Sequence, residues 1–220
     1  MRRIIVCMIL VLFTGAISSA QGIRLSGYGG YVFDDKMDSY YDATHYYDGK
    51  IKGGFQWGVG VEYLLVPAYG IELLYLRQDT KLPMDYYSSG VKHTDFDLGV
   101  NYIMVGGNRY LNPDMKITPY AGALLGVAIF NLKNPDSGNE GTHTFFAWGL
   151  KAGGIFNANS SMSIKIQAHL LSAVQSVGAG YYFGGGAVLT SYSTIYQFGF
   201  SGGLTFQLWS GTSKSTKRKN

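Results

Sequence analysis

The feature that constrains this chain most is the alternation of residue types over residues 196–209. Every second residue is apolar or glycine, namely Tyr196, Phe198, Phe200, Gly202, Leu204, Phe206 and Leu208, and the residues between them are polar or glycine. A period of two places successive side chains on opposite faces, so it predicts an extended strand with one apolar face. Whether that face meets a protein core or lipid decides the fold class.

The first 20 residues have the organisation of a secretory signal peptide. Two arginines precede an apolar run, and small residues follow the run up to Ala20. This pattern predicts cleavage after Ala20, and the run is shorter than the roughly 20 residues that a membrane-spanning helix needs. Cys7 lies inside the run, so we expect a mature chain without cysteine or disulfides.

Composition and charge favour a β protein without a nucleic-acid partner. The chain has 31 glycines and 18 tyrosines but only 5 prolines, which suits many short strands. Its formal charge is +4, but two cations lie in the signal and four in residues 210–220. Subtracting these six leaves −2 for residues 21–209, too little for a nucleic-acid footprint. We expect residues 210–220 to be a basic tail that follows the folded domain.

Eight segments alternate in this way and predict eight strands. They are residues 23–33, 55–65, 70–77, 95–105, 118–130, 145–156, 162–170 and 195–209. Long connections (34–54, 78–94, 131–144, 171–194) alternate with shorter ones (66–69, 106–117, 157–161). Within residues 106–117, Arg109–Leu111 could instead extend a strand. The pattern predicts an all-β fold: residues 21–209 form an eight-stranded antiparallel up-and-down transmembrane β-barrel with both termini on the short-turn side.

The two faces of the predicted strands differ in charge. The apolar face includes Phe96, Leu98, Val100, Tyr102 and Met104 of the fourth strand, and its only charge is Arg77. The opposite face carries Arg24, Glu62, Glu72, Asp95, Asp97, Lys151 and Lys165, with glycines such as Gly60, Gly99 and Gly122. A soluble eight-stranded barrel would have to pack the many aromatic residues inside a narrow core. We therefore predict an apolar wall in lipid around a polar lumen.

The segment T-P-Y-A-G-A-L-L-G-V at residues 118–127 and the last strand carry a family resemblance. With the signal and the alternation, they resemble the small outer-membrane β-barrel superfamily of Gram-negative bacteria, the OmpA-transmembrane-like and OmpX-like proteins. The resemblance covers the mature chain to Trp209. It implies a location in the bacterial outer membrane with both mature termini in the periplasm, so that residues 210–220 would be a basic periplasmic tail. It also implies an assembly signal at Ser201, Gly203, Phe206 and Leu208, which the barrel-assembly machinery would read. Many members end on the terminal aromatic residue, whereas this chain continues to residue 220.

The charged residues of the inward face define a predicted interior ionic core. Its members are Arg24, Glu62, Glu72, Lys151 and Lys165. Glu62 and Glu72 flank one short turn and would repel each other unless a cation lies between them. We favour a structural polar core that fills the lumen; the alternative is a salt-bridged plug that opens.

Other chemistry has weak support in the sequence. His45, His93 and His143 lie in or beside the long connections without metal-ligand spacing, so we expect no metal and no cofactor. His169 and Ser172 would not share a face of a regular strand, so no nucleophile–base pair is predicted. We expect no enzyme and no catalytic residue.

The long connections are the predicted recognition elements. Residues 34–54 are rich in aspartate and tyrosine, which suits a protein or glycan ligand. Residues 171–194 are apolar and glycine-rich; they either extend the strands for strand addition or fold over the mouth. The predicted role is envelope structure or surface interaction by a monomer in outer-membrane lipid. A narrow channel for ions or small solutes is the alternative, and a lipid-modifying enzyme is less favoured.

Overall fold

The computed structural model describes residues 22–37, 41–42, 45–87, 91–113, 115–135, 138–159, 161–174, 180–183, 187–190 and 195–210. The predicted signal peptide with its cleavage after Ala20, and nearly all of the basic tail, lie outside these residues. No helix in the described part of the chain is long and apolar enough to cross a membrane.

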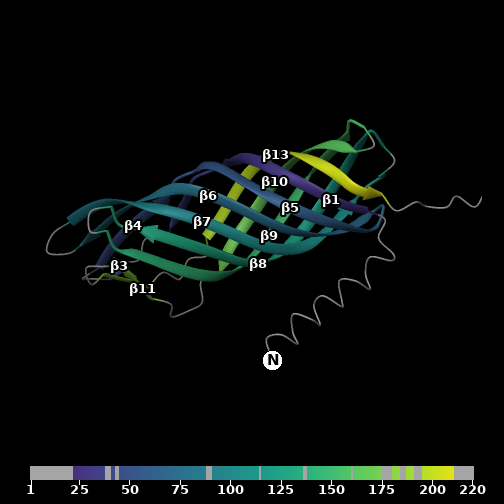
Figure 1. Cartoon of the computed structure of the whole chain (residues 1–220). Helices are drawn as coiled ribbons and strands as arrows, with labels where there is room; N and C mark the ends of the chain where they lie inside the picture. The colour runs from purple at the N-terminus through teal and green to yellow at the C-terminus, as the bar shows by residue number, and fades with distance from the viewer. Residues whose placement is uncertain are drawn as a thin grey trace, which may run out of the picture.

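Eight long strands close into one antiparallel barrel (Figure 1). They are β1 (Gly22–Val32), β5 (Gly54–Val66), β6 (Tyr69–Tyr87), β7 (Val91–Tyr110), β8 (Ile117–Lys133), β9 (Glu140–Asn157), β10 (Met162–Val174) and β13 (Ile195–Ser210). Each strand pairs with its neighbour in the chain, and β13 pairs with β1 from Gly22↔Ser210 to Val32↔Gly199 to close the ring. The predicted fold class is confirmed, and both ends of the described barrel lie at the short-turn end.

The barrel wall is taller on one side than the sequence predicted. Strands β6 to β9 have 17 to 20 residues, whereas β1, β5 and β10 have 11 to 13. The predicted loops 78–94 and 131–144 were therefore wrong over most of their length. The β6–β7 ladder continues to Tyr87↔Val91, and the β8–β9 ladder continues to Lys133↔Glu140.

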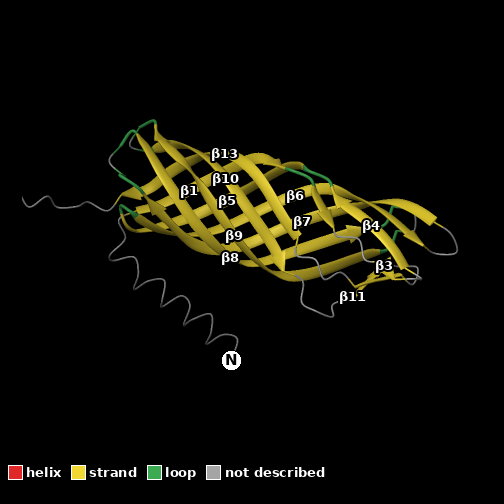
Figure 2. Cartoon of the chain, turned by 180° about the vertical axis from the view of Figure 1, so that it is seen from behind, coloured by secondary structure: helices red, strands yellow, loops and turns green. Residues whose placement is uncertain are grey.

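The other two long connections also contain strands. Residues 34–54 include β2 (Asp35–Met37), β3 (Tyr41–Asp42) and β4 (His45–Ile51), and β4 pairs with the upper part of β6. In residues 171–194, β10 continues to Val174, and β11 (Gly180–Phe183) pairs with β12 (Ala187–Thr190) in a separate sheet. Figure 2 shows β4 beside the tall part of the wall.

Below this tall part, the outer wall is apolar. Exposed outward-facing side chains include Leu73 (56%), Leu125 (57%), Ile166 (53%) and Leu208 (63%). These positions follow the predicted faces of seven of the eight strands. The apolar side chains stand outside and the charged ones inside, which is the reverse of a soluble barrel.

The predicted faces of β7 were wrong. Phe96, Leu98, Val100, Tyr102 and Met104 are buried in the lumen at 0–3% exposure, while Asp95 and Asp97 are exposed on the outer face. Gly99 likewise belongs to the outward set, next to the side chains of Asp79 and Asn131. Side chains alternate with a period of two, so one wrong choice of phase reverses every residue of a strand.

The correction of β7 reveals a change of polarity along the barrel axis. On the tall side, a hydrogen-bonded row across four strands joins Arg77, Asn101, Ile129 and Thr144. Beyond this row, toward the long loops, the outer face is polar, and we call this surface the polar band. Its outward-facing residues include Asp79, Lys81, Asp95, Asp97, Asn131, Lys133, Glu140 and Thr142. The inner face at this level is apolar, with Leu82, Phe96, Leu98 and Leu132 buried. At the level of the polar band, the outer face is thus polar and the inner face apolar, as in a barrel that is surrounded by water.

Candidate functional site in the lumen and at its mouth

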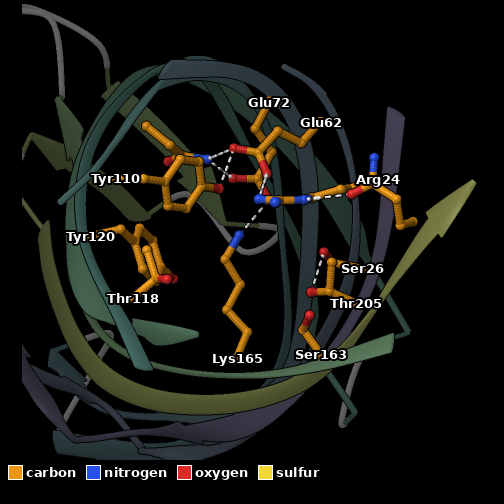
Figure 3. A network of polar contacts seen from close by, with 12 residues as sticks. Arg24, Ser26, Glu62, Glu72, Tyr110, Thr118, Tyr120, Ser163, Lys165 and Thr205 are labelled. Carbon is orange, nitrogen blue, oxygen red and sulfur yellow. Dashed lines mark hydrogen bonds and ion pairs between the residues drawn. The ribbon is translucent and has the colours of Figure 1, made fainter. Parts of the chain in front are cut away.

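The predicted ionic core lies in the half of the lumen nearest the short turns, since Glu62 and Glu72 pair close to the turn between β5 and β6. Figure 3 shows Arg24, Glu62, Glu72 and Lys165 of this core. Glu62, Glu72, Lys151 and Lys165 are 0–3% exposed, and the Arg24 side chain is 23% exposed. The structure thus brings all five predicted residues together. Three cations and two carboxylates give this core a formal charge of +1.

Glu72 is the centre of the network. Its Oε2 is paired with Lys151 Nζ, and both side chains are fully buried. Its Oε1 accepts a hydrogen bond from Tyr28 at 2.7 Å and lies 3.9 Å from Lys165 Nζ. Lys165 lies 4.8 Å from the centre of the Tyr120 ring and donates to Tyr28 at 3.1 Å. Aromatic rings thereby supply much of the surroundings of this buried ammonium group.

Asn108 separates the two glutamates, which sequence reasoning did not anticipate. Its Nδ2 donates to Glu62 Oε1 at 2.6 Å and to Glu72 Oε2 at 3.0 Å. Tyr110 also donates to Glu62, while Arg24 Nη1 lies 3.9 Å from Glu62 Oε2. The neutral amide therefore bridges carboxylates that would otherwise repel across the pair Glu62↔Glu72.

Glycines give these long side chains their room. A Cβ on Gly60 would lie 2.6 Å from Glu72 Oε1, and one on Gly122 would lie 2.4 Å from Asn108 Oδ1. Both are closer than real Cβ contacts, so a larger residue at either position would displace a side chain of the network. The predicted glycines of the inward face therefore leave space for the charged side chains in this half of the barrel.

An apolar layer fills the lumen beyond the ionic core. Leu74, Met104, Leu124 and Leu171 are at most 1% exposed and belong to one cluster that continues toward the long-loop end. Farther along, Tyr102 donates to Gln197 at 2.8 Å, and Gln197 donates to Gln78 at 2.9 Å. The lumen is therefore polar in one half and largely apolar in the other, and the prediction of a polar interior throughout was wrong.

The histidines do not form a metal or catalytic site in the described part of the chain. No group of three or more potential metal ligands occurs among the described residues. His93 pairs with Asp95 at 3.5 Å, and the side chain of His45 lies outside the described residues. His169 is buried in the lumen, whereas Ser172 pairs with Trp148 and Tyr196 on the outward register. The two side chains thus lie on different faces.

Hydrogen bonds fix the base of residues 34–54 to the barrel. Asp34 accepts from the Gly53 amide at 2.6 Å and pairs with Lys50. The hydrogen bonds from Lys50 and the Gly53 amide lower the pKa of Asp34 below its ordinary value of 3.8. Asp35 Oδ2 accepts from the Tyr196 amide at 2.9 Å, which joins this connection to the start of β13.

Exposed aromatic residues flank the apolar wall at both ends. Near the long loops, the Phe33 and Phe198 rings stack at 5.9 Å, and Trp57 contacts Tyr75 at 5.8 Å. At the short-turn end, Arg109 lies 5.7 Å from the centre of the Tyr69 ring. Aromatic girdles at two interfaces, an apolar wall between them and a charged interior define a transmembrane β-barrel.

Comparison with known proteins shows the fold. No protein-family model and no curated protein matches the sequence. Neisserial surface protein A superposes with a TM-score of 0.56 at 14% identity, covering 86% of this chain and 99% of that one. Outer membrane protein OprG from Pseudomonas aeruginosa gives 0.53 at 11% identity, covering 86% and 97%. The chain therefore has the fold of the small eight-stranded outer-membrane β-barrels.

Proposed function

We propose that this protein is an integral outer-membrane protein that binds a surface ligand through its long-loop end. In this arrangement the tall wall and residues 34–54 project from the cell, and both termini lie in the periplasm. Ser201, Gly203, Phe206 and Leu208 act as the assembly signal; Phe206 and Leu208 are 43% and 63% exposed on the outer face of β13, and a partner can reach them there before closure. The proposed form is a monomer.

One observation supports this role: buried side chains fill the lumen, while additional strands enlarge the wall beyond the membrane. Leu74, Met104, Leu124 and Leu171 are at most 1% exposed in the lumen, and an apolar layer of this kind opposes the passage of ions. In contrast, β4 adds to β6 beside the mouth, and Asp34, Asp35 and their partners hold this addition in place. Binding residues on loops that a rigid scaffold positions are the common arrangement for recognition. The structure favours recognition over conduction.

The test is a binding comparison on whole cells. Cells that display the full chain are applied to arrays of glycans and extracellular proteins, beside cells in which a short glycine–serine linker replaces residues 36–49. We expect binding to be lost with residues 36–49 and kept when residues 135–139, the tip of the β8–β9 hairpin, are replaced in the same way. Equal binding by the 36–49 replacement, in a barrel that still migrates as folded in unheated gels, contradicts the proposed role.

The rival function is a narrow channel, and it predicts a different result. Reconstituted protein would then give stable unitary currents in planar bilayers whether or not residues 36–49 are present. The described residues do not support a catalytic mechanism, because His169 and Ser172 lie on different faces of their strand. We therefore assign no reaction to this protein.

A further inference from the structure

A groove of about 570 Å³ lies on the outer face of the wall, within the polar band. Gly99 of β7 lines it between Asp79 of β6 and Asn131 of β8. Lys81 and Lys133 stand on the long-loop side of Gly99, and Arg77 stands on the side toward the membrane. The groove therefore opens sideways from the barrel and away from the mouth.

Three ion pairs surround the groove. Arg77 binds Asp79 through two hydrogen bonds of 2.8 and 3.0 Å. Lys81 pairs with Asp97 at 3.1 Å, and Lys133 pairs with Glu140 at 2.9 Å. All six side chains are 38–66% exposed. The pairs fix the positions of cations and carboxylates while leaving their outer sides accessible to a ligand.

Neutral polar groups complete the lining. Thr142 donates to Asn131 Oδ1 at 3.0 Å, which orients that amide. Tyr75 donates to Asn101 Oδ1 at 2.9 Å, next to the groove on the membrane side. Fixed amides, carboxylates and hydroxyls beside one another are the groups that hydrogen-bond to vicinal hydroxyls, while lysine and arginine bind phosphate oxygens.

The position of the groove identifies the source of such a ligand. On the same strands, directly toward the membrane, the outer face becomes apolar with Ile103, Val105 and Leu125, each 45–57% exposed. Acyl chains that lie against these residues place their headgroups at the level of Arg77 and Gly99. A ligand held in the groove is therefore one whose chains occupy the apolar wall below it.

We propose that the groove binds the phosphorylated saccharide headgroup of an outer-leaflet glycolipid. Lys81, Lys133 and Arg77 contact phosphate. Asp79 and Glu140 accept hydrogen bonds from sugar hydroxyls, and the Asn131 amide donates to or accepts from them. The groove has as many carboxylates as cations, so an anionic lipid headgroup without hydroxyl groups matches it poorly. The inference rests on the membrane orientation proposed above, but not on the identity of the surface ligand.

Gly99 offers a steric test that leaves the charges intact. A Cβ at Gly99 would meet Asp79, Asn131 and Arg77 at 3.5–3.9 Å, which are ordinary contacts, so a larger side chain fills the groove without moving the backbone. Gly27 on β1 is the matched control, because a Cβ there meets nothing within 4 Å. It also faces outward, on a wall without the polar band.

The experiment measures binding of fluorescent lipopolysaccharide to the purified full chain in detergent. Phosphatidylglycerol and the same lipopolysaccharide after removal of its phosphates serve as comparison lipids. We expect Gly99→Leu to weaken lipopolysaccharide binding by about tenfold or more, Gly27→Leu to leave it unchanged, and the double variant Lys81→Gln/Lys133→Gln to weaken it similarly. Wild-type protein should bind both comparison lipids at least about tenfold less tightly.

Two results overturn this inference: wild-type affinity in both groove variants, or equal affinity for the three lipids. If Gly99→Leu does not migrate as a folded barrel, the double lysine variant decides alone, because both side chains are exposed. Absence of lipopolysaccharide binding by wild-type protein that still inserts into bilayers contradicts the groove only. Failure of the wild-type protein to insert contradicts the proposed membrane location instead.

Discussion

Lys151 of β9 and Glu72 of β6 form a fully buried ion pair across the lumen, with two strands between them in the wall. Neither side chain has access to water, so each group depends on the other and on its hydrogen bonds. Replacing one member of a buried pair leaves the other uncompensated, which typically costs roughly 3–5 kcal/mol. This dependence gives the first prediction.

Lys151→Met is expected to lower the free energy of unfolding by roughly 3–5 kcal/mol. Adding Glu72→Gln should recover part of the loss, because the unpaired carboxylate is then gone. Urea titration of the barrel in lipid vesicles measures both. Lys133→Met, which breaks an exposed pair with Glu140, is the control and should have little effect, because water screens that pair. Strictly additive losses for Lys151→Met and Glu72→Gln would show that the pair is not coupled.

Arg24 should matter less than Lys151. Its Nη1 is 3.9 Å from Glu62 Oε2 and its side chain is 23% exposed, so water screens the pair. Arg24 also donates to Gln207 at 2.9 Å. We expect Arg24→Ala to destabilise the barrel by less than Lys151→Met in the same urea titration. An equal or larger loss for Arg24→Ala would contradict the assignment of the Lys151–Glu72 pair as the main electrostatic contact.

Asn108→Asp tests the bridge between the glutamates. The change replaces an amide donor that is 2.6 and 3.0 Å from two carboxylates with a third acceptor. Leaving buried groups unsatisfied costs about 1–3 kcal/mol each, and more when they are charged, so we expect a loss of several kcal/mol. Asn131→Asp, on the exposed outer face, is the control with little expected effect. A tolerated Asn108→Asp would mean that the glutamates have another partner.

The fold could be predicted from the sequence to a large extent, but the faces of β7 could not. In the membrane part of β7, Ile103, Met104 and Val105 are all apolar, so alternation gives no phase there. In the upper part, Asp95 and Asp97 alternate with Phe96 and Leu98, and the rule that apolar residues face lipid predicts the wrong phase for them. Beyond the membrane that rule reverses, because water then surrounds the wall. One error of phase therefore reversed the faces of the whole strand.

The site was predictable in its charges and not in its neutral members. Arg24, Glu62, Glu72, Lys151 and Lys165 stand out as rare charges on otherwise uncharged strands. Asn108 and Tyr110 do not, because the sequence predicts a turn over residues 106–117, whereas β7 continues to Tyr110. Tyr120 lies in a predicted strand, but it carries no charge that would mark it. Their roles depend on the strand register, which places Asn108 opposite Gly70 and Gly122.

The wild-type barrel should not conduct. Met104, Leu124 and Leu171 close the lumen at 0–1% exposure, and a dry apolar layer opposes the passage of ions. Planar-bilayer recordings should show no stable unitary currents, with a reconstituted general porin as the positive control. Stable unitary currents that persist in the Lys151→Met variant would mean that ions cross the apolar layer in spite of these side chains.

The base of residues 34–54 should loosen in acid. Hydrogen bonds from Lys50 and the Gly53 amide depress the pKa of Asp34 below 3.8 in the folded state. A depressed pKa means that this contribution is fully present above about pH 4 and is lost as the pH falls through the lower folded value. We expect protection of the Gly53 amide from hydrogen exchange, corrected for intrinsic rates, to fall between pH 6 and pH 2. In Asp34→Asn the protection should be lower at pH 6 and change less with pH.

The most direct test of the membrane account compares two spin labels on one strand. Leu125 and Lys133 both face outward on β8, at 57% and 56% exposure, the first in the apolar wall and the second in the polar band. In reconstituted bilayers, a label at Leu125→Cys should be relaxed by oxygen and shielded from a water-soluble nickel chelate. A label at Lys133→Cys should show the reverse. Free access of nickel to position 125, or a lipid-like signal at position 133, would contradict an apolar wall in lipid that ends at the polar band.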